Sequence, residues 1–184
     1  MRVISGSAKG RRLASVPGDS TRPITDRVKE SLFNIIGPEI QNSTFLDLFA
    51  GTGGVGIEAL SRGAECALFV DLNRRAIKTV QANLQLTQLA DRAQVIHGNA
   101  FTILDGPAKD KYDYIYIAPP QYKGLWLEAL EVLDAHLDWL SPDGWVIVQI
   151  HPRELTDCKL DHMIEFDRRT YGSTLLIFFQ NESG

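Results

Sequence analysis

The sequence predicts an α/β fold built on a mostly parallel sheet, and three observations carry that prediction. Short apolar runs alternate with segments of helical periodicity over residues 45–150. Two further strands, 160–166 and 174–179, then follow each other across a polar turn at 167–173. Alternating strands and helices are typical of a parallel sheet with right-handed crossovers, whereas so short a connection requires antiparallel strands. We therefore expect a parallel sheet that finishes with an antiparallel hairpin.

The alternating region is expected to contain five strands and three helices. We place the strands at residues 45–49, 67–70, 94–97, 112–117 and 145–150. The helices include residues 57–60, stopping at Gly63, then 73–84 and 125–140, because their apolar residues recur every three or four positions. Since no linker, repeat or low-complexity segment interrupts the chain, we expect one domain over residues 1–184, with its core at 44–184.

The segment ahead of this core has a pattern of its own. Residues 1–17 are expected to form a β-hairpin, because two short apolar runs, 3–5 and 12–16, flank a turn at 6–10. Residues 18–40 are expected to be a helical segment that Thr25 caps and Gly37 ends.

Charge is distributed unevenly along the chain. The 184 residues carry a net charge of −4, yet residues 1–30 hold seven basic side chains against three acidic ones. A basic arm on an acidic body is what docking to phosphates requires, although a solvated hairpin with incidental charge explains it as well. The basic residues that would contact such phosphates are Arg2, Lys9, Arg11, Arg12, Arg22 and Arg27.

Composition also argues against several classes of protein. The chain has no apolar run long enough to span a membrane, and its first residues lack the core of a signal peptide. Its two cysteines, Cys66 and Cys158, lie far apart and suggest no metal site. Because Cys66 lies in an apolar run, we expect it to be buried and reduced. These features predict a cytoplasmic protein without a metal, and we expect a monomer.

The central motif is a glycine-rich turn, residues 51–56, directly after the first strand. Gly51 and Gly53 let the backbone approach a ligand closely, and helix amides then point toward it. Asp71 ends the next strand, where a carboxylate can accept both hydroxyls of an adenosine ribose.

This spacing alone fits either a dinucleotide or S-adenosylmethionine. Asp47 favours S-adenosylmethionine, because a carboxylate beside the turn repels a pyrophosphate and attracts the amino group of a methionine moiety. Asn99, after the third strand, either accepts a hydrogen bond from an adenine amine or caps a helix. The candidate cofactor-binding residues are Asp47, Phe49, Gly51, Gly53, Asp71, Leu72, Asn99 and Ala100.

A second motif follows the fourth strand. Pro119 and Pro120 fix a rigid turn at the carboxyl edge of the sheet, where open α/β sheets bind ligands. The prolines could also do no more than end the strand, but their alignment with the glycine turn favours a function. The candidate functional residues of this turn are Ala118, Pro119, Pro120, Gln121 and Tyr122.

Several segments together resemble the RsmD-type 16S rRNA guanine-N2 methyltransferases. They are residues 2–11, the run Thr-Arg-Pro-Ile-Thr-Asp-Arg-Val-Lys-Glu-Ser-Leu-Phe-Asn at 21–34, the block 47–63, and residues 169–174. The resemblance implies a class I methyltransferase (Rossmann-like) fold with S-adenosylmethionine as methyl donor. It implies that the acceptor is the N2 amine of a guanine in small-subunit rRNA, free or in an assembly particle. It also implies that Asp47, Gly51 and Gly53 contact the methionine end, that Asp71 holds the ribose, and that residues 1–17 dock RNA.

The resemblance also implies that residues 118–122 form the catalytic loop, and this loop departs from the family at two positions. The family has Asp or Asn where Ala118 stands and an aromatic residue where Gln121 stands. Ala118 offers an amine only its carbonyl, and Tyr122 is displaced by one position from the place of the stacking aromatic. Asn99 also replaces an aspartate that is common in the family.

These departures keep other functions open. The main alternative is a methyltransferase fold that binds cofactor or RNA but is catalytically impaired. A nicotinamide-dependent oxidoreductase is suggested by the glycine spacing alone, and a DNA methyltransferase differs from the first prediction only in its substrate.

Overall fold

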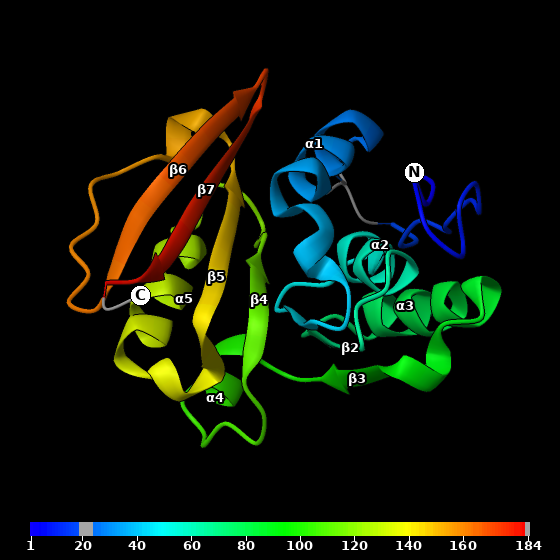
Figure 1. Cartoon of the computed structure of the whole chain (residues 1–184), viewed down its shortest axis with the longest axis horizontal. Helices are drawn as coiled ribbons and strands as arrows, with labels where there is room; N and C mark the ends of the chain where they lie inside the picture. Colours follow the sequence, from blue (N-terminus) through cyan, green and yellow to red (C-terminus); the bar gives the residue numbers. More distant parts are fainter. Residues whose placement is uncertain (19–23, 183–184) are drawn as a thin grey trace.

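The computed structural model describes residues 1–18 and 24–182 (Figure 1). The α-helices are α1 (Asp26–Ile36), α2 (Gly54–Ser61), α3 (Arg74–Thr87), α4 (Ala100–Leu104) and α5 (Leu125–Ala135). The strands are β1 (Thr44–Asp47), β2 (Cys66–Asp71), β3 (Ala93–His97), β4 (Tyr112–Ile117), β5 (Leu140–Ile150), β6 (Met163–Tyr171) and β7 (Thr174–Asn181). Short 3-10 turns occupy Gly37–Ile40, Ala90–Arg92, Leu137–Trp139 and Pro152–Glu154.

The strands form one seven-stranded sheet in the order β3-β2-β1-β4-β5-β7-β6. Strands β1 to β5 are parallel to one another, and β7 lies antiparallel between β5 and β6. The predicted parallel sheet with a closing hairpin is therefore confirmed. Strand order reverses between β1 and β4, and ligands of open α/β sheets bind at the carboxyl ends of strands at such a point.

Helices cover both faces of the sheet (Figure 1). One apolar core joins α1, α2 and α3 to residues such as Phe45, Phe69 and Phe178 of the strands. The other joins α4 and α5 to alternate strand residues such as Leu46 and Ile115. Both sheet faces are thus buried, as the apolar composition of the central strands requires. Among the described residues, the helices include none long and apolar enough to cross a membrane.

The helix predicted after Thr25 is confirmed with its caps. The Thr25 side chain accepts a hydrogen bond from the Val28 amide at 3.3 Å, and the Gly37 amide donates to the Phe33 carbonyl. Gly37 has a φ of +72°, which favours glycine at the end of a helix.

Two predictions are wrong, the end of one strand and the burial of Cys66. Strand β6 continues to Tyr171, so the turn before β7 contains Gly172 and Ser173 and not the whole polar stretch 167–173. Polarity did not end this strand because β6 lies at the edge of the sheet, where charged side chains such as Arg168 face solvent. Cys66 is exposed and not buried, because it is the first residue of β2 and the buried part of the strand begins after it.

The N-terminal arm, residues 1–17, doubles back on itself with less pairing than a β-hairpin has. A single antiparallel bridge joins Arg2 to Arg12, in place of the two expected strands. The amides of Ile4 and Ser5 donate instead to the carboxylate of Glu58 on α2, at 2.8 and 3.0 Å. The arm is therefore fastened to α2 by the two amides that follow its paired residue Val3.

Candidate active site

A cavity with two chambers opens at the carboxyl ends of the central strands. The large chamber has a volume of about 1010 Å³ and the small chamber about 210 Å³. The two share the wall residues Phe49, Gly51, Ala118 and Gln149. The cavity therefore joins the two sequence motifs, the glycine turn after β1 and the proline turn after β4.

The glycine turn forms one side of both chambers. Gly51 has a φ of +54°, in the region that favours glycine. Gly56, inside α2, packs so closely on β2 that a Cβ there would lie 2.4 Å from the Phe69 ring. The two Asp71 carboxylate oxygens accept hydrogen bonds from the amides of Gly51 and Asn73, both at 2.8 Å. Asp71 therefore holds the turn in shape and still has lone pairs that point to a ligand.

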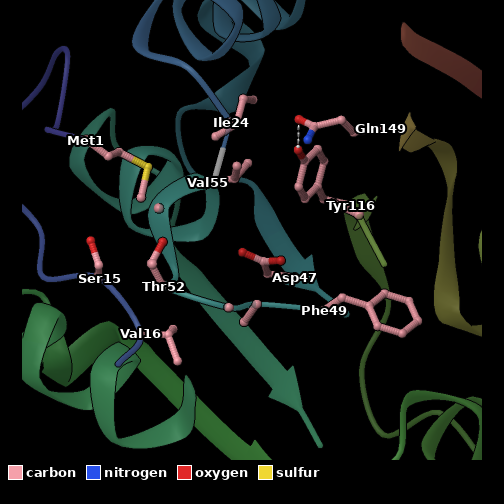
Figure 2. Close-up of a pocket in the computed structure, with 14 residues that line it drawn as sticks. Met1, Ser15, Val16, Ile24, Asp47, Phe49, Thr52, Val55, Tyr116 and Gln149 are labelled. Carbon is pink, nitrogen blue, oxygen red and sulfur yellow. Dashed lines mark hydrogen bonds between the residues drawn. The ribbon is translucent and has the colours of Figure 1, made fainter. Parts of the chain in front are cut away.

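Asp47 ends β1 and lies in the wall of the small chamber (Figure 2). Its side chain is 2% exposed, and it accepts a hydrogen bond from the Gly56 amide at 3.3 Å. Burial, with a smaller contribution from Asp71, raises the pKa of Asp47 to about 7. Within the described residues, no lysine, arginine or histidine forms a salt bridge with it. A buried carboxylate in this state favours a cationic ligand.

The large chamber has the features that an adenosine needs. Asp71 lies in its wall, and Leu72, with 67% of its surface exposed, offers an apolar face. A hydrogen bond of 2.9 Å from the His97 ring to the Leu72 carbonyl fixes this part of the backbone. Asn99 caps α4 by accepting a hydrogen bond from the Phe101 amide at 2.9 Å, and it also lines the chamber. Of the two interpretations of Asn99, the helix cap is thus present, and the adenine contact stays a prediction.

Seven of the eight predicted cofactor-binding residues line this cavity. Phe49, Gly51, Asp71, Leu72, Asn99 and Ala100 line the large chamber, and Asp47 lines the small one. Gly53 lies behind the turn as the N-cap of α2, with a φ of +75°. These features fit S-adenosylmethionine. They are the unpaired carboxylate of Asp47, the glycine turn at the start of α2, and the carboxylate of Asp71 beside the apolar Leu72.

The N-terminal arm closes the small chamber. Met1, Ser15 and Val16 from the two ends of the arm line it, opposite Tyr116 and Gln149 (Figure 2). Asn83 of α3 fixes the second end of the arm, because its side chain exchanges hydrogen bonds with the backbone of Ala14 at 2.8 and 3.2 Å. The same side chain donates to the Thr52 carbonyl at 2.9 Å, so the arm and the glycine turn are held by one residue.

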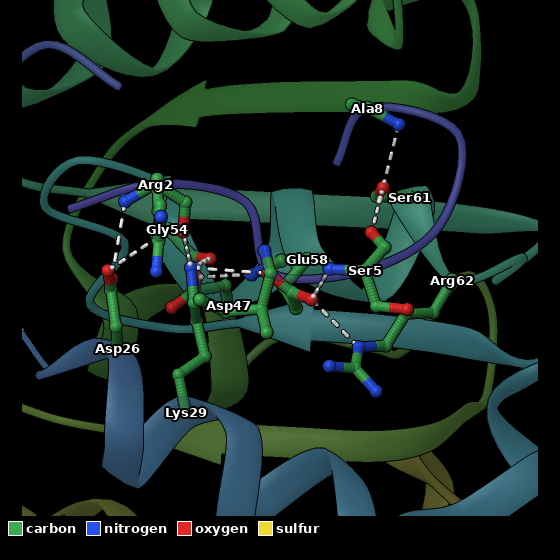
Figure 3. A network of polar contacts seen from close by, with 12 residues as sticks. Arg2, Ser5, Ala8, Asp26, Lys29, Asp47, Gly54, Glu58, Ser61 and Arg62 are labelled. Carbon is green, nitrogen blue, oxygen red and sulfur yellow. Dashed lines mark hydrogen bonds and ion pairs between the residues drawn. The ribbon is translucent and has the colours of Figure 1, made fainter. Parts of the chain in front are cut away.

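A buried ionic network fixes the first end of the arm (Figure 3). Lys29 and Glu58 have fully buried side chains and form an ion pair at 3.2 Å. Arg62 adds a hydrogen bond to Glu58 at 2.8 Å, and Lys29 donates to the Arg2 carbonyl at 2.6 Å. The sequence pattern did not predict this network, although Lys29 lies at a core position of α1, three residues before Leu32 and four before Phe33.

The predicted basic residues lie on the arm and the start of α1. Lys9, Arg11, Arg12 and Arg27 are exposed, and Arg2 is exposed but also forms an ion pair with Asp26 at 3.3 Å. Arg22 lies outside the residues that the structure describes. The two ends of the arm line the small chamber through Met1, Ser15 and Val16, whereas the turn of the arm packs on the last residue of α2, where the Ser7 amide donates to the Ser61 carbonyl at 2.8 Å.

The proline turn lies in the opposite wall. Ala118, Pro119, Pro120 and Gln121 line the large chamber, as predicted for a loop that meets the cofactor site. Tyr122 lines neither chamber, and 65% of its surface is exposed. Its φ of +60° turns it away, its amide donates to Glu154 at 2.6 Å, and its ring lies 5.8 Å from that of His151. The structure thus separates Tyr122 from the four residues before it.

Comparison with known proteins identifies the family of this chain. A family model described as conserved hypothetical protein 95 matches residues 1–180. A Bacillus subtilis protein provisionally named rRNA methyltransferase YlbH is 46% identical over 177 residues, 95% of each chain. Ribosomal RNA small subunit methyltransferase D (RsmD) of Escherichia coli is 34% identical over 149 residues, 81% of this chain and 74% of the relative. The chain belongs to the RsmD family.

Solved structures agree with this RsmD assignment. The protein yhhF of Escherichia coli, provisionally described as a methyltransferase, has a TM-score of 0.88 at 30% identity and covers 100% of this chain and 99% of its own. A protein of Haemophilus influenzae, provisionally described as a methylase, has a TM-score of 0.78 at 31% identity and covers 98% and 97%. The predicted class I methyltransferase fold of this RsmD-family chain is confirmed.

Proposed function

We propose that this chain transfers a methyl group from S-adenosylmethionine to the N2 amine of a guanine in 16S rRNA. One observation carries the proposal: Asp47, a buried carboxylate that forms no salt bridge among the described residues, lies in a cavity that the N-terminal arm helps to line. The carboxylate suits the cationic end of the methyl donor, and the arm suits the phosphates of RNA. Both requirements of an RNA methyltransferase therefore meet in one cavity.

The residues would divide the work by position. Asp47 would hold the donor's amino group, Asp71 its ribose, and Leu72 and Ala100 its base. When bound, S-adenosylmethionine supplies a methyl group on a positively charged sulfur, which makes that carbon electrophilic. The target base has to leave its stack to reach the cavity, and the exposed Lys9, Arg11, Arg12 and Arg27 would grip the flanking phosphates.

The Ala118 carbonyl, on the wall shared by both chambers, would accept a hydrogen bond from the amine. Because Asp71 lines the large chamber and Asp47 the small one, the donor would extend from the large chamber into the small one, and the base would approach the wall that the two chambers share. Alignment and exclusion of water are then the main catalytic contributions of the protein. We further propose that the chain acts in the cytoplasm as a monomer.

The test is methyl transfer from radiolabelled S-adenosylmethionine to purified 16S rRNA and to immature small subunits. We expect label in N2-methylguanosine after nuclease digestion, and loss of most transfer in Asp47→Asn. Asp91→Asn, at an exposed position far from the cavity, serves as the matched control and should keep full activity. Label in N6-methyladenosine would show that the target is an adenine and not a guanine. Transfer to DNA in preference to RNA would show that the chain is a DNA methyltransferase.

The impaired alternative makes a different prediction in the same experiment. A chain that binds S-adenosylhomocysteine and RNA but transfers no label to either substrate would establish it. Stabilisation by NAD and not by S-adenosylhomocysteine in a thermal-shift assay would instead favour the oxidoreductase.

A further inference from the structure

Gln149 is the polar side chain that faces both chambers from β5. It lies in the wall shared by the large and small chambers, together with Ala118. The Tyr116 hydroxyl donates a hydrogen bond of 2.5 Å to its Oε1 atom (Figure 2). Burial, with a smaller contribution from Asp47, raises the pKa of Tyr116 well above its usual value, so this hydroxyl stays protonated and remains a donor. Tyr116 thereby fixes the orientation of the Gln149 amide.

The register of the sheet places Gln149 beside Ala118. Strands β4 and β5 run parallel, with Ile117 opposite Val148, so the next residues along the two strands are Ala118 and Gln149. Residues opposite each other in neighbouring parallel strands point to the same side of the sheet. A side chain at 149 therefore reaches the space that a longer side chain at 118 would otherwise occupy.

The amide has the chemistry that Ala118 lacks. Its Oε1 atom has a second lone pair beyond the one that Tyr116 uses, and its Nε2 atom carries two donors. An exocyclic amine beside a ring nitrogen presents the complementary donor and acceptor, which a glutamine can contact as a pair. Gln149 can thus accept an N–H of the amine and donate to the adjacent ring nitrogen.

We propose that Gln149, oriented by Tyr116, is a catalytic residue that accepts the hydrogen bond of the substrate's exocyclic amine in place of a side chain at position 118. The assignment rests on the proposed function, because it requires an amine-bearing base at the wall that the two chambers share. It explains how a loop that begins with Ala118 keeps an acceptor at the reacting nitrogen.

The transfer balances without a further reagent. The lone pair of the amine nitrogen forms the new N–C bond, and the electron pair of the broken C–S bond stays on sulfur. The surplus proton on nitrogen passes to water, because an amide oxygen is too weak a base to keep it. The contribution of Gln149 is to direct the nitrogen lone pair toward the methyl carbon while the N–H is held.

The test compares single-turnover rates of Gln149→Met with the wild type, on the RNA substrate at saturating S-adenosylmethionine. Methionine keeps the length of the side chain but cannot accept the hydrogen bond strongly, so we expect a rate about 100-fold lower. Tyr116→Phe frees the amide to rotate and should lower the rate about tenfold, since the acceptor is retained. The double variant Ala118→Asn/Gln149→Met restores an acceptor after the neighbouring strand β4. It should be at least tenfold faster than Gln149→Met.

Gln180→Met is the matched control, because Gln180 is a partly buried glutamine on β7 that pairs with Trp145 at the other end of β5. It should keep the wild-type rate. If Gln149→Met is as fast as an active wild type, the assignment of Gln149 is overturned and the proposed function stands. The same holds if the double variant is no faster than Gln149→Met. A wild type that transfers nothing would overturn the proposed function and this assignment with it.

A binding measurement adds a readout that does not depend on turnover. An RNA with inosine at the mapped target position lacks the exocyclic amine. Without the methyl donor, the wild type should bind the guanine RNA about tenfold more tightly than the inosine RNA, and Gln149→Met should bind both equally. Undiminished discrimination in Gln149→Met would show that another group contacts the amine, and would overturn the assignment.

Discussion

Two buried carboxylates, one on each side of the glycine turn, have opposite surroundings. Glu58 accepts hydrogen bonds from the Ile4 and Ser5 amides and pairs with Lys29 and Arg62, at distances of 2.8 to 3.2 Å. Asp47 accepts one hydrogen bond, from the Gly56 amide, among the residues that the structure describes. Both side chains are nearly inaccessible to solvent, at 0% and 2% exposed.

The difference separates a structural charge from a charge that awaits a ligand. Burying a carboxylate is unfavourable unless cations and hydrogen bonds replace the lost water. For Glu58 the protein supplies those partners, and the bonds fasten the N-terminal arm to α2. For Asp47 the missing partner is external, so the same desolvation raises its pKa to about 7 and leaves it ready for a cation.

The largest expected effect comes from breaking the paired carboxylate. Glu58→Ala leaves the buried Lys29 ammonium without its counterion and removes the acceptor of two arm amides. Losing one member of a buried pair costs several kcal/mol, so we expect the free energy of unfolding to fall by about 5 kcal/mol. Urea denaturation measures this change.

Two variants sharpen that result. Glu131→Ala removes an exposed glutamate of α5 and should change stability by less than about 0.5 kcal/mol. Lys29→Met/Glu58→Gln removes both charges and should be less destabilising than Glu58→Ala alone. If the double variant is as unstable as Glu58→Ala, the cost comes from packing and not from the unpaired charge.

Removing the charge of the unpaired carboxylate, Asp47, should raise the free energy of unfolding instead of lowering it. The pKa of Asp47 is raised from 3.8 to about 7 in the folded chain, so between these values the folded state holds a proton that the unfolded state has lost. Its contribution to stability is therefore favourable at low pH and lost as the pH rises to about 7. Asp47→Asn removes this dependence and should stabilise the chain above pH 7 by up to about 4 kcal/mol, with little effect at pH 4.

The same substitution should weaken ligand binding. Calorimetry with S-adenosylhomocysteine at pH 7.5 should show an affinity about 100-fold lower for Asp47→Asn, since charged hydrogen bonds contribute about 1.5–3 kcal/mol. Wild-type affinity should rise from about pH 6 to 7 as Asp47 ionises, and fall above about pH 8 as the ligand's amino group loses its proton. An unstable Asp47→Asn with unchanged affinity would place Asp47 with Glu58, as a structural group.

The sequence predicted the Asp47 side of this comparison and missed the Glu58 side, for a physical reason. Asp47, the glycine turn and Asp71 follow strands whose carboxyl ends must meet at one edge of a parallel sheet, so local order along the chain determines their proximity. Glu58 and Lys29 belong to different helices, and their pairing depends on how α1 packs against α2. The contact between Gln149 and Tyr116 likewise needs the register of β4 and β5, which the sequence pattern does not give.

The arm illustrates the same limit. The sequence predicted the turn of the arm, its positive charge and its position ahead of the core. It did not predict how the backbone of the arm is paired. The amides of Ile4 and Ser5 donate to Glu58 on a helix more than fifty residues away in the sequence. The proline turn was located correctly, whereas the direction of Tyr122 depended on a positive φ and on Glu154, which lies more than thirty residues further along the chain.

The smallest expected effect concerns Asn99, a polar group that the protein satisfies only in part. Its Oδ1 atom caps α4, and one lone pair of that oxygen remains for an adenine amine. Asn99→Ser keeps a good capping oxygen on a shorter side chain, so the melting temperature should change by no more than a degree or two. The affinity for S-adenosylhomocysteine should fall about fivefold, the effect of one neutral hydrogen bond. The inosine analogue of the ligand has no adenine amine and should bind wild type and Asn99→Ser equally. If Asn99→Ser binds S-adenosylhomocysteine as tightly as the wild type does, Asn99 is a helix cap alone, and belongs with Glu58 among the groups that only hold the fold.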